Sequence, residues 1–86
     1  ARRVFVDGAE VALKNKEYEL LLFLLSNPDI VFSKETLYER IWGYDAMGDN
    51  ATEVVHINRL REKIEKDPAH PRYIQTVWGA GYRFKP

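Results

Sequence analysis

Residues 52–63 read TEVVHINRLREK, and the spacing of their apolar side chains predicts an amphipathic helix. At about 100° per residue, the side chains expected on its core stripe are Val54, Ile57, Leu60 and Ile64. The side chains expected on the opposite face are Thr52, Val55, His56, Arg59 and Lys63. An ordinary solvated face carries Glu and Lys and seldom a bare Val, so this mixture indicates a surface that meets a partner.

The residues that flank this stretch predict where the helix begins and ends. Asn50 and Glu53 have the spacing of a capping box, and Pro68 cannot continue a helix. Lys63 and Lys66 suit the negative end of the helix dipole. We therefore predict a helix over residues 51–66.

Hairpins are expected near both ends of the chain. Residues 3–13 contain two short strand-like runs around Asp7-Gly8, a dipeptide that tolerates the positive φ of a tight turn. Residues 73–77 and 82–84 are also strand-like, and Gly79-Ala80-Gly81 lies between them.

Two more helices are predicted between the first hairpin and residue 50. The Leu-rich residues 16–26 form the first, with Asn15 as its candidate N-cap and Pro28 just beyond its end. Ser33 is the N-cap expected for the second, which extends to Trp42. Residues 30–32 predict a short strand between these helices, and residues 43–49 a loop. The inward stripe of the second helix consists of Leu37, Tyr38 and Ile41.

The composition indicates one small domain. The chain has 86 residues, of which 45% are apolar, enough for a single core. It has no cysteine, which excludes disulfides and thiolate metal sites and fits a reducing cytoplasm. Its longest apolar run, residues 20–25, is too short to cross a bilayer. Because it lacks an initial Met and enters strand-like sequence at once, we expect it to be excised from a longer protein.

The charges are unevenly distributed although the formal net charge is zero. Residues 1–50 hold six basic and nine acidic side chains, a balance of −3, whereas residues 51–86 hold seven basic and four acidic ones, a balance of +3. Such asymmetry is one feature of nucleic-acid-binding proteins, and it is equally typical of a solvated charge pattern.

Catalysis is not indicated by any motif. His56 and His70 are distant in sequence and have no adjacent carboxylate motif, and the chain has no glycine-rich phosphate loop or zinc-ligand spacing. We expect no enzyme activity, no metal and no cofactor.

Several motifs, in their order along the chain, resemble the C-terminal effector domains of OmpR/PhoB-type response regulators. The resemblance covers residues 4–84 and rests on Val6-Asp7-Gly8, residues 16–21 (KEYELL), residues 31–37 (VFSKETL), Ile41-Trp42-Gly43, Val55-His56-Ile57, Arg59-Leu60-Arg61, Thr76-Val77, Gly79, Gly81 and Tyr82. It implies an α+β winged helix-turn-helix with three helices, an N-terminal hairpin that is the remnant of a small antiparallel sheet, and a C-terminal hairpin called the wing.

The resemblance also implies a function and partners. The domain would bind double-stranded DNA and regulate transcription in a two-component phosphorelay, with residues 51–66 in the major groove and the wing, residues 73–84, near the minor groove. An upstream receiver domain would promote homodimers on direct repeats in the cytoplasm.

The family pattern assigns roles to individual residues. Base readout falls to Val55 and Arg59. Contacts to the DNA backbone fall to Lys34, Trp42, Thr52, His56, Asn58, Arg61, Thr76 and Tyr82. The loop that contacts RNA polymerase in relatives corresponds to Tyr44, Asp45, Ala46, Met47, Gly48 and Asp49.

Alternatives and departures accompany these assignments. Trp42 is equally expected in the core, and Arg61 has Glu65 as an alternative partner at i, i+4. Trp78 replaces an Arg that probes the minor groove in many relatives, while Asn58 and Ala51 stand at often basic positions. Fewer phosphate contacts predict modest affinity and a shallow salt dependence. Asn15 is expected to take over capping where Lys14 replaces the usual Thr. A protein-binding adaptor without a DNA role is the alternative function.

Overall fold

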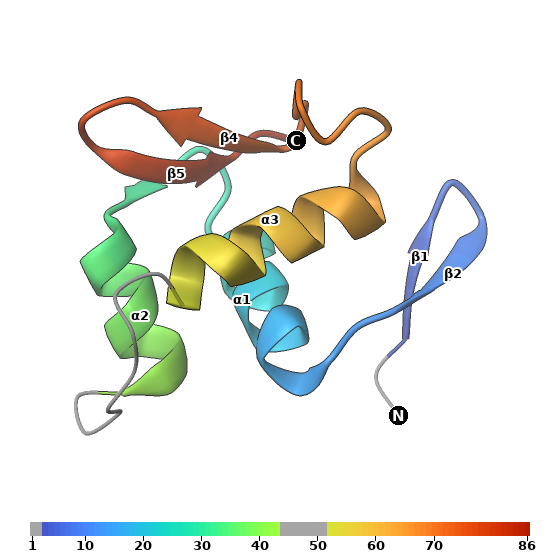
Figure 1. Ribbon diagram of the computed structural model, residues 1–86, viewed down its shortest axis with the longest axis horizontal. Helices are drawn as coiled ribbons and strands as arrows, with labels where there is room; N and C mark the ends of the chain where they lie inside the picture. Colours follow the sequence, from blue (N-terminus) through green and yellow to red (C-terminus); the bar gives the residue numbers. More distant parts are fainter. Residues whose placement is uncertain (1–2, 44–51) are drawn as a thin grey trace.

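The computed structural model describes residues 3–43 and 52–86. The elements are β1 (Arg3–Val6), β2 (Ala9–Ala12), α1 (Asn15–Leu25), β3 (Val31–Phe32), α2 (Lys34–Trp42), α3 (Thr52–Ile64), β4 (Ile74–Val77) and β5 (Gly81–Phe84). This order confirms the predicted α+β arrangement of hairpin, helix, short strand, two helices and hairpin. In Figure 1, α3 crosses in front of α1, and α2 lies to one side of both.

The three helices bury their apolar stripes against one another. Leu20 and Leu24 of α1, Leu37 of α2, and Ile57 and Leu60 of α3 have no exposed side-chain surface. Each fully buried Leu or Ile contributes about 1.5 to 3 kcal/mol relative to leaving it in water. The predicted core stripe of α3 is thus confirmed, with Val54 half-buried at its edge.

The C-terminal end of α3 differs from the prediction. The helix ends at Ile64 and not at residue 66, well before Pro68. Directly after the helix, the buried carboxylate of Glu65 accepts hydrogen bonds from the backbone N–H groups of Arg72, Tyr73 and Ile74. These bonds join the end of α3 to the segment that leads into β4. The Asn50–Glu53 capping box lies outside the residues whose side chains are described.

The start of α1 is also corrected. Asn15 lies inside the helix, so it does not replace the missing cap, and Lys14 occupies the N-cap position. A Lys side chain has no acceptor for the free N–H groups of a helix end. Glu17 supplies the other half of the cap, because its Oε1 accepts from the Lys14 N–H at 3.0 Å. For α2 the predicted cap is confirmed: Ser33 Oγ accepts from the Thr36 N–H at 3.1 Å.

The strands form two separate sheets. In the larger sheet the order is β3-β5-β4, all antiparallel, so the wing hairpin is fixed to the strand that leads into α2. The other sheet is the β1–β2 hairpin alone, whose turn has positive φ at Asp7 (50°) and Gly8 (83°) as that dipeptide predicts. Figure 1 shows this hairpin and the wing turn at opposite ends of the long axis.

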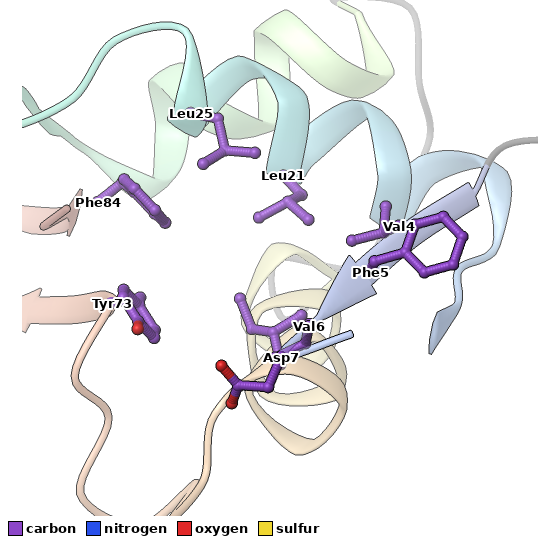
Figure 2. A pocket seen from close by; sticks show the side chains of 9 residues that line it. Val4, Phe5, Val6, Asp7, Leu21, Leu25, Tyr73 and Phe84 are labelled. Carbon is purple, nitrogen blue, oxygen red and sulfur yellow. The ribbon is translucent and has the colours of Figure 1, made fainter. Parts of the chain in front are cut away.

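The first hairpin touches the helical core along one face only. A hollow of about 250 Å³ lies beneath it. Figure 2 shows Val6 of β1 on one side of this hollow, Leu21 and Leu25 of α1 on another, and Tyr73 and Phe84 opposite. The hairpin thus packs on the core through Val4 and Val6, while Phe5 between them is exposed.

Candidate nucleic-acid interface

The outward face of α3 differs from the predicted one: Asn58 and Glu62 are exposed on it, whereas His56 and Lys63 are half-buried. With Ile57, Leu60 and Ile64 buried, the side chains opposite them at about 100° per residue are exposed. These exposed side chains are Val55, Asn58, Arg59 and Glu62. Val55 is 41% exposed, an apolar group held in water among polar neighbours. The face thus offers one methyl-bearing group, one amide, one guanidinium and one carboxylate to a partner.

One flank of this face is aromatic. The ring of His56 meets the ring of Trp42 edge-on, with centroids 4.8 Å apart and planes at 74°. Trp42 in turn stacks on Tyr38 at 5.5 Å. His56, Trp42 and Tyr38 are all half-buried, so they join α2 to α3 and keep one edge accessible. Both sequence interpretations of Trp42, packing and surface contact, are compatible with this position.

Lys63 does not lie on the outward face, and that prediction is wrong. Its Nζ is 2.6 Å from Oε1 of Glu17, a carboxylate of α1 with no exposed surface. The long Lys side chain bends along the helix flank to bring its charge to this buried acid, because an unpaired buried carboxylate is costly. The pair therefore fixes α3 to α1.

This ion pair makes stability sensitive to acid. Burial raises the pKa of Glu17, but the hydrogen bonds from Lys63 and the Lys14 N–H and the Lys63 charge lower it, and the net pKa lies below the ordinary 4.5. A carboxyl with a depressed folded-state pKa adds stability above its unfolded pKa and loses it as pH falls through the folded value.

We expect Glu17→Gln to reduce the loss of stability below pH 4.5. Urea unfolding of the parent and this variant at pH 7 and at pH 3 to 4 measures it. The free energies of unfolding should differ most at pH 7 and converge in acid. Glu19→Gln, which removes a more exposed carboxylate of the same helix, is the matched control. Parallel pH profiles for Glu17→Gln and the parent would contradict the assignment.

The other flank of α3 faces the wing through Arg61. Its Nε donates to the Ile74 carbonyl at 3.0 Å, and its Nη2 donates to Thr76 Oγ1 at 2.8 Å. The guanidinium also lies over the Tyr82 ring, 5.7 Å from the centroid. The fork is thus directed to β4 and β5, whereas the alternative partner Glu65 binds backbone N–H groups.

A cleft of about 400 Å³ separates the wing from the start of α2. Lys34 and Glu35 line it from the first turn of α2, and Thr76, Trp78 and Tyr82 line it from the wing. The first turn of a helix presents N–H groups that suit an anion. Lys34, Thr76 and Tyr82 add donors to the same cleft, so the structure brings together three residues that the family resemblance assigned to the DNA backbone.

The turn of the wing presents Trp78 to solvent. Its side chain is 92% exposed, the most exposed of the large apolar residues described. It follows β4 directly, and Gly79, with φ of 78°, makes the reversal possible. Trp78 therefore does not pack on the domain.

Some residues assigned to DNA contacts lie outside the described part of the structure, and the sequence analysis missed two structurally important residues. The side chain of Thr52, Ala51 and the loop Tyr44–Asp49 lie outside the described residues. The sequence interpretation named Glu17 only as part of the motif KEYELL and Glu65 only as an alternative partner of Arg61, but both are buried. For Glu17, its place in the first turn of α1 was an available signal. For Glu65 there was none, because its partners are backbone groups seven to nine residues away.

The described residues add no sign of a membrane span or a metal centre. None of their helices combines the length and apolar content needed to cross a membrane. Within the same residues, no three His, Asp or Glu side chains gather as metal ligands would.

Three packed helices, a hairpin fixed beside them, and an exposed face on the last helix define a winged helix-turn-helix domain. The sequence model of the family described as "Transcriptional regulatory protein, C terminal" matches residues 8–84. The chain belongs to this family, and the resemblance to OmpR/PhoB-type regulators is confirmed.

Known proteins agree with this membership. The transcriptional regulatory protein YvrH of Bacillus subtilis is 49% identical over 83 residues, which cover 96% of this chain and 35% of YvrH. The response regulator DrrB of Thermotoga maritima, an OmpR/PhoB homolog, superposes with a TM-score of 0.90 at 40% identity, over 98% of this chain and 38% of DrrB. The RstA DNA-binding domain of Klebsiella pneumoniae, solved in complex with the RstA box, superposes with a TM-score of 0.85 at 28% identity. The match covers 98% of this chain and 83% of the RstA chain. The chain thus spans about a third of YvrH.

Proposed function

We propose that this chain binds double-stranded DNA sequence-specifically, as the effector domain of a two-component transcriptional regulator. The observation that carries the proposal is the outward face of α3, where Val55, Asn58 and Arg59 are exposed while the opposite stripe forms the core. A major groove admits an α-helix and offers base edges, thymine methyl groups and phosphate rims to such side chains. The RstA domain, a structural relative, was solved with its DNA box.

Base readout is assigned to two residues. Arg59 has a planar fork that matches N7 and O6 of guanine, and it is exposed near the middle of α3. Val55, one helical turn earlier, can meet a thymine methyl group. Asn58 lies beside both and is assigned a hydrogen bond to the DNA backbone.

Backbone contacts are assigned around this centre. Lys34, Thr76 and Tyr82 line the cleft between α2 and the wing, where one phosphate would be approached from both sides. On the other flank His56 and Trp42 present the edge that joins α2 to α3. Thr52, at the first position of α3, is assigned to a phosphate by the family pattern. Trp78 at the wing turn is assigned to the minor-groove side.

The composition of the face favours DNA over a protein-binding adaptor. An adaptor surface needs contiguous apolar area, whereas Val55 is the single large apolar side chain among the four exposed residues of this face. The other three, Asn58, Arg59 and Glu62, are hydrogen-bonding groups, of which Asn58 and Arg59 suit base edges and phosphates.

Replacing Arg59 is expected to reduce both affinity and specificity. Arg59→Ala should cost about 1 to 3 kcal/mol on a selected duplex and relax discrimination at one base position, because one bidentate contact disappears. Titration of selected and random duplexes at two salt concentrations measures both effects.

Lys34→Ala is the matched control for this measurement. It removes one positive charge from the phosphate cleft, so it should weaken binding to all duplexes alike and lower the salt slope by about 0.9. An equal loss on every duplex for both variants would refute the role of Arg59 in base readout.

We propose a wider context by the same family pattern. An upstream receiver domain would pair two copies of the domain on direct repeats in the cytoplasm. The segment Tyr44–Asp49, between α2 and α3, would contact RNA polymerase.

A further inference from the structure

The family pattern places Arg61 on the rim of the DNA as a free cation, but its contacts are internal. Nε and Nη2 each donate to the wing, at 3.0 Å to the Ile74 carbonyl and at 2.8 Å to the Thr76 hydroxyl. Tyr82, the cross-strand partner of Thr76, lies under the guanidinium. Arg61 of α3 thus contacts both strands of the wing: it donates to Ile74 and Thr76 on β4 and lies over Tyr82 on β5.

The contact with Thr76 also leaves the O–H group of Thr76 able to donate to a partner other than Arg61. A hydroxyl group has one O–H donor, and its oxygen accepts. Because Thr76 Oγ1 accepts from Arg61, its own hydrogen points to another group. Thr76 is exposed and lines the cleft opposite Lys34, where a phosphate oxygen is the acceptor that the proposed function supplies.

The charge of Arg61 is partly withdrawn from solvent. Burial lowers its pKa, opposed by nearby Tyr82 and Glu65, although an Arg stays protonated at any physiological pH. Because two of its N–H groups already donate to a carbonyl and a hydroxyl, the Arg61 guanidinium is less free to bind a phosphate.

We infer that Arg61 is a positioning residue. It sets the wing against α3, the recognition helix of the proposed function, and orients the Thr76 hydroxyl as a phosphate donor. The inference rests on the proposed function and departs from the phosphate contact that the family pattern assigns to Arg61. The inference predicts that DNA affinity depends on the two hydrogen bonds that the Arg61 guanidinium makes and hardly on its positive charge.

The test compares Arg61→Lys, Arg61→Ala, Thr76→Val and the double variant Arg61→Ala/Thr76→Val in the 86-residue chain. Lys keeps the charge but has no fork to reach two acceptors at once. We expect both Arg61 variants and Thr76→Val to bind selected and random duplexes about tenfold more weakly, with the double variant no weaker than either single one. The salt slope should stay at the parent value.

Several results would overturn the inference. A direct phosphate contact predicts that Arg61→Ala lowers the salt slope by about 0.9 and that Arg61→Lys binds like the parent. Additive losses in the double variant would show that Arg61 and Thr76 act separately. If an Arg61 variant does not fold, Thr76→Val still tests the hydroxyl. Parent-like DNA affinity of Thr76→Val would refute the role of the Thr76 hydroxyl as a phosphate donor. Thr76→Ser keeps the hydroxyl and should retain parent affinity.

The same titrations separate this inference from the proposed function. If the parent chain does not distinguish selected from random duplexes, the proposed function fails. If the parent discriminates and Arg59→Ala loses that discrimination, while Arg61→Lys binds normally, only the inference about Arg61 fails.

Discussion

Gly81→Ala is expected to lower the free energy of unfolding by about 4 kcal/mol, because the wing lies too close to β3 to admit a side chain at this position. A Cβ on Gly81 would stand 2.0 Å from the Phe32 carbonyl oxygen and 2.8 Å from the Ser33 Cα, both backbone atoms. Its φ of 142° is also a conformation that side chains disfavour. The wing would have to leave β3, so DNA affinity should fall together with stability.

Urea unfolding followed by circular dichroism measures the change, and Gly79→Ala is the matched control. Gly79 also has a positive φ, 78°, but nothing lies within 4 Å of its added Cβ. Its cost should be about 1 to 2 kcal/mol, from backbone strain alone. Equal losses for the two variants would mean that the close approach of the wing to Phe32 contributes nothing.

Glu65→Ala is expected to cost about 3 kcal/mol of stability. Glu65 is 7% exposed. It accepts from three consecutive backbone N–H groups, those of Arg72 (2.9 Å), Tyr73 (3.0 Å) and Ile74 (2.8 Å). Removing it leaves these donors without their acceptor, and the Ile74 bond is fully buried.

Two further variants define the origin of that loss. Glu62→Ala removes an exposed carboxylate from the last turn of α3, three residues before Glu65, and should change stability by less than about 0.5 kcal/mol. Glu65→Gln keeps one acceptor oxygen but places an NH₂ group against donors, so it should fall between the parent and Glu65→Ala. Thermal unfolding of the four proteins at pH 7 ranks them, and a loss for Glu62→Ala as large as for Glu65→Ala would contradict the argument.

Local patterns predicted most of the fold. The apolar spacing in TEVVHINRLREK located Ile57 and Leu60 in the core, Asp7-Gly8 located the first turn, and Ser33 located the cap of α2. These features depend on residues a few positions apart, so helix geometry and turn chemistry suffice to infer them. The same periodicity placed Val55 and Arg59 on the exposed face.

Predictions that depended on long side chains or distant partners were incomplete or wrong. Lys63 lies at the helical angle of the outward face, but it has enough length to reach Glu17, 46 residues away. Arg61 passes over its near neighbour Glu65 and binds Thr76 on the wing. A helical projection describes where a Cβ points, and it does not describe where a flexible charged end finds its partner.

The sequence by itself determined the family, the order of the elements, the buried stripe of α3 and the exposed position of Val55 and Arg59, because each is written in short-range periodicity and motif order. The tertiary structure decided how the recognition helix is held: Glu17 with Lys63 on α1, Arg61 with Thr76 on the wing, and Glu65 beneath the loop before β4. Charged groups settle where burial and hydrogen-bonding partners offset their loss of water, and those partners meet only when the whole chain has folded.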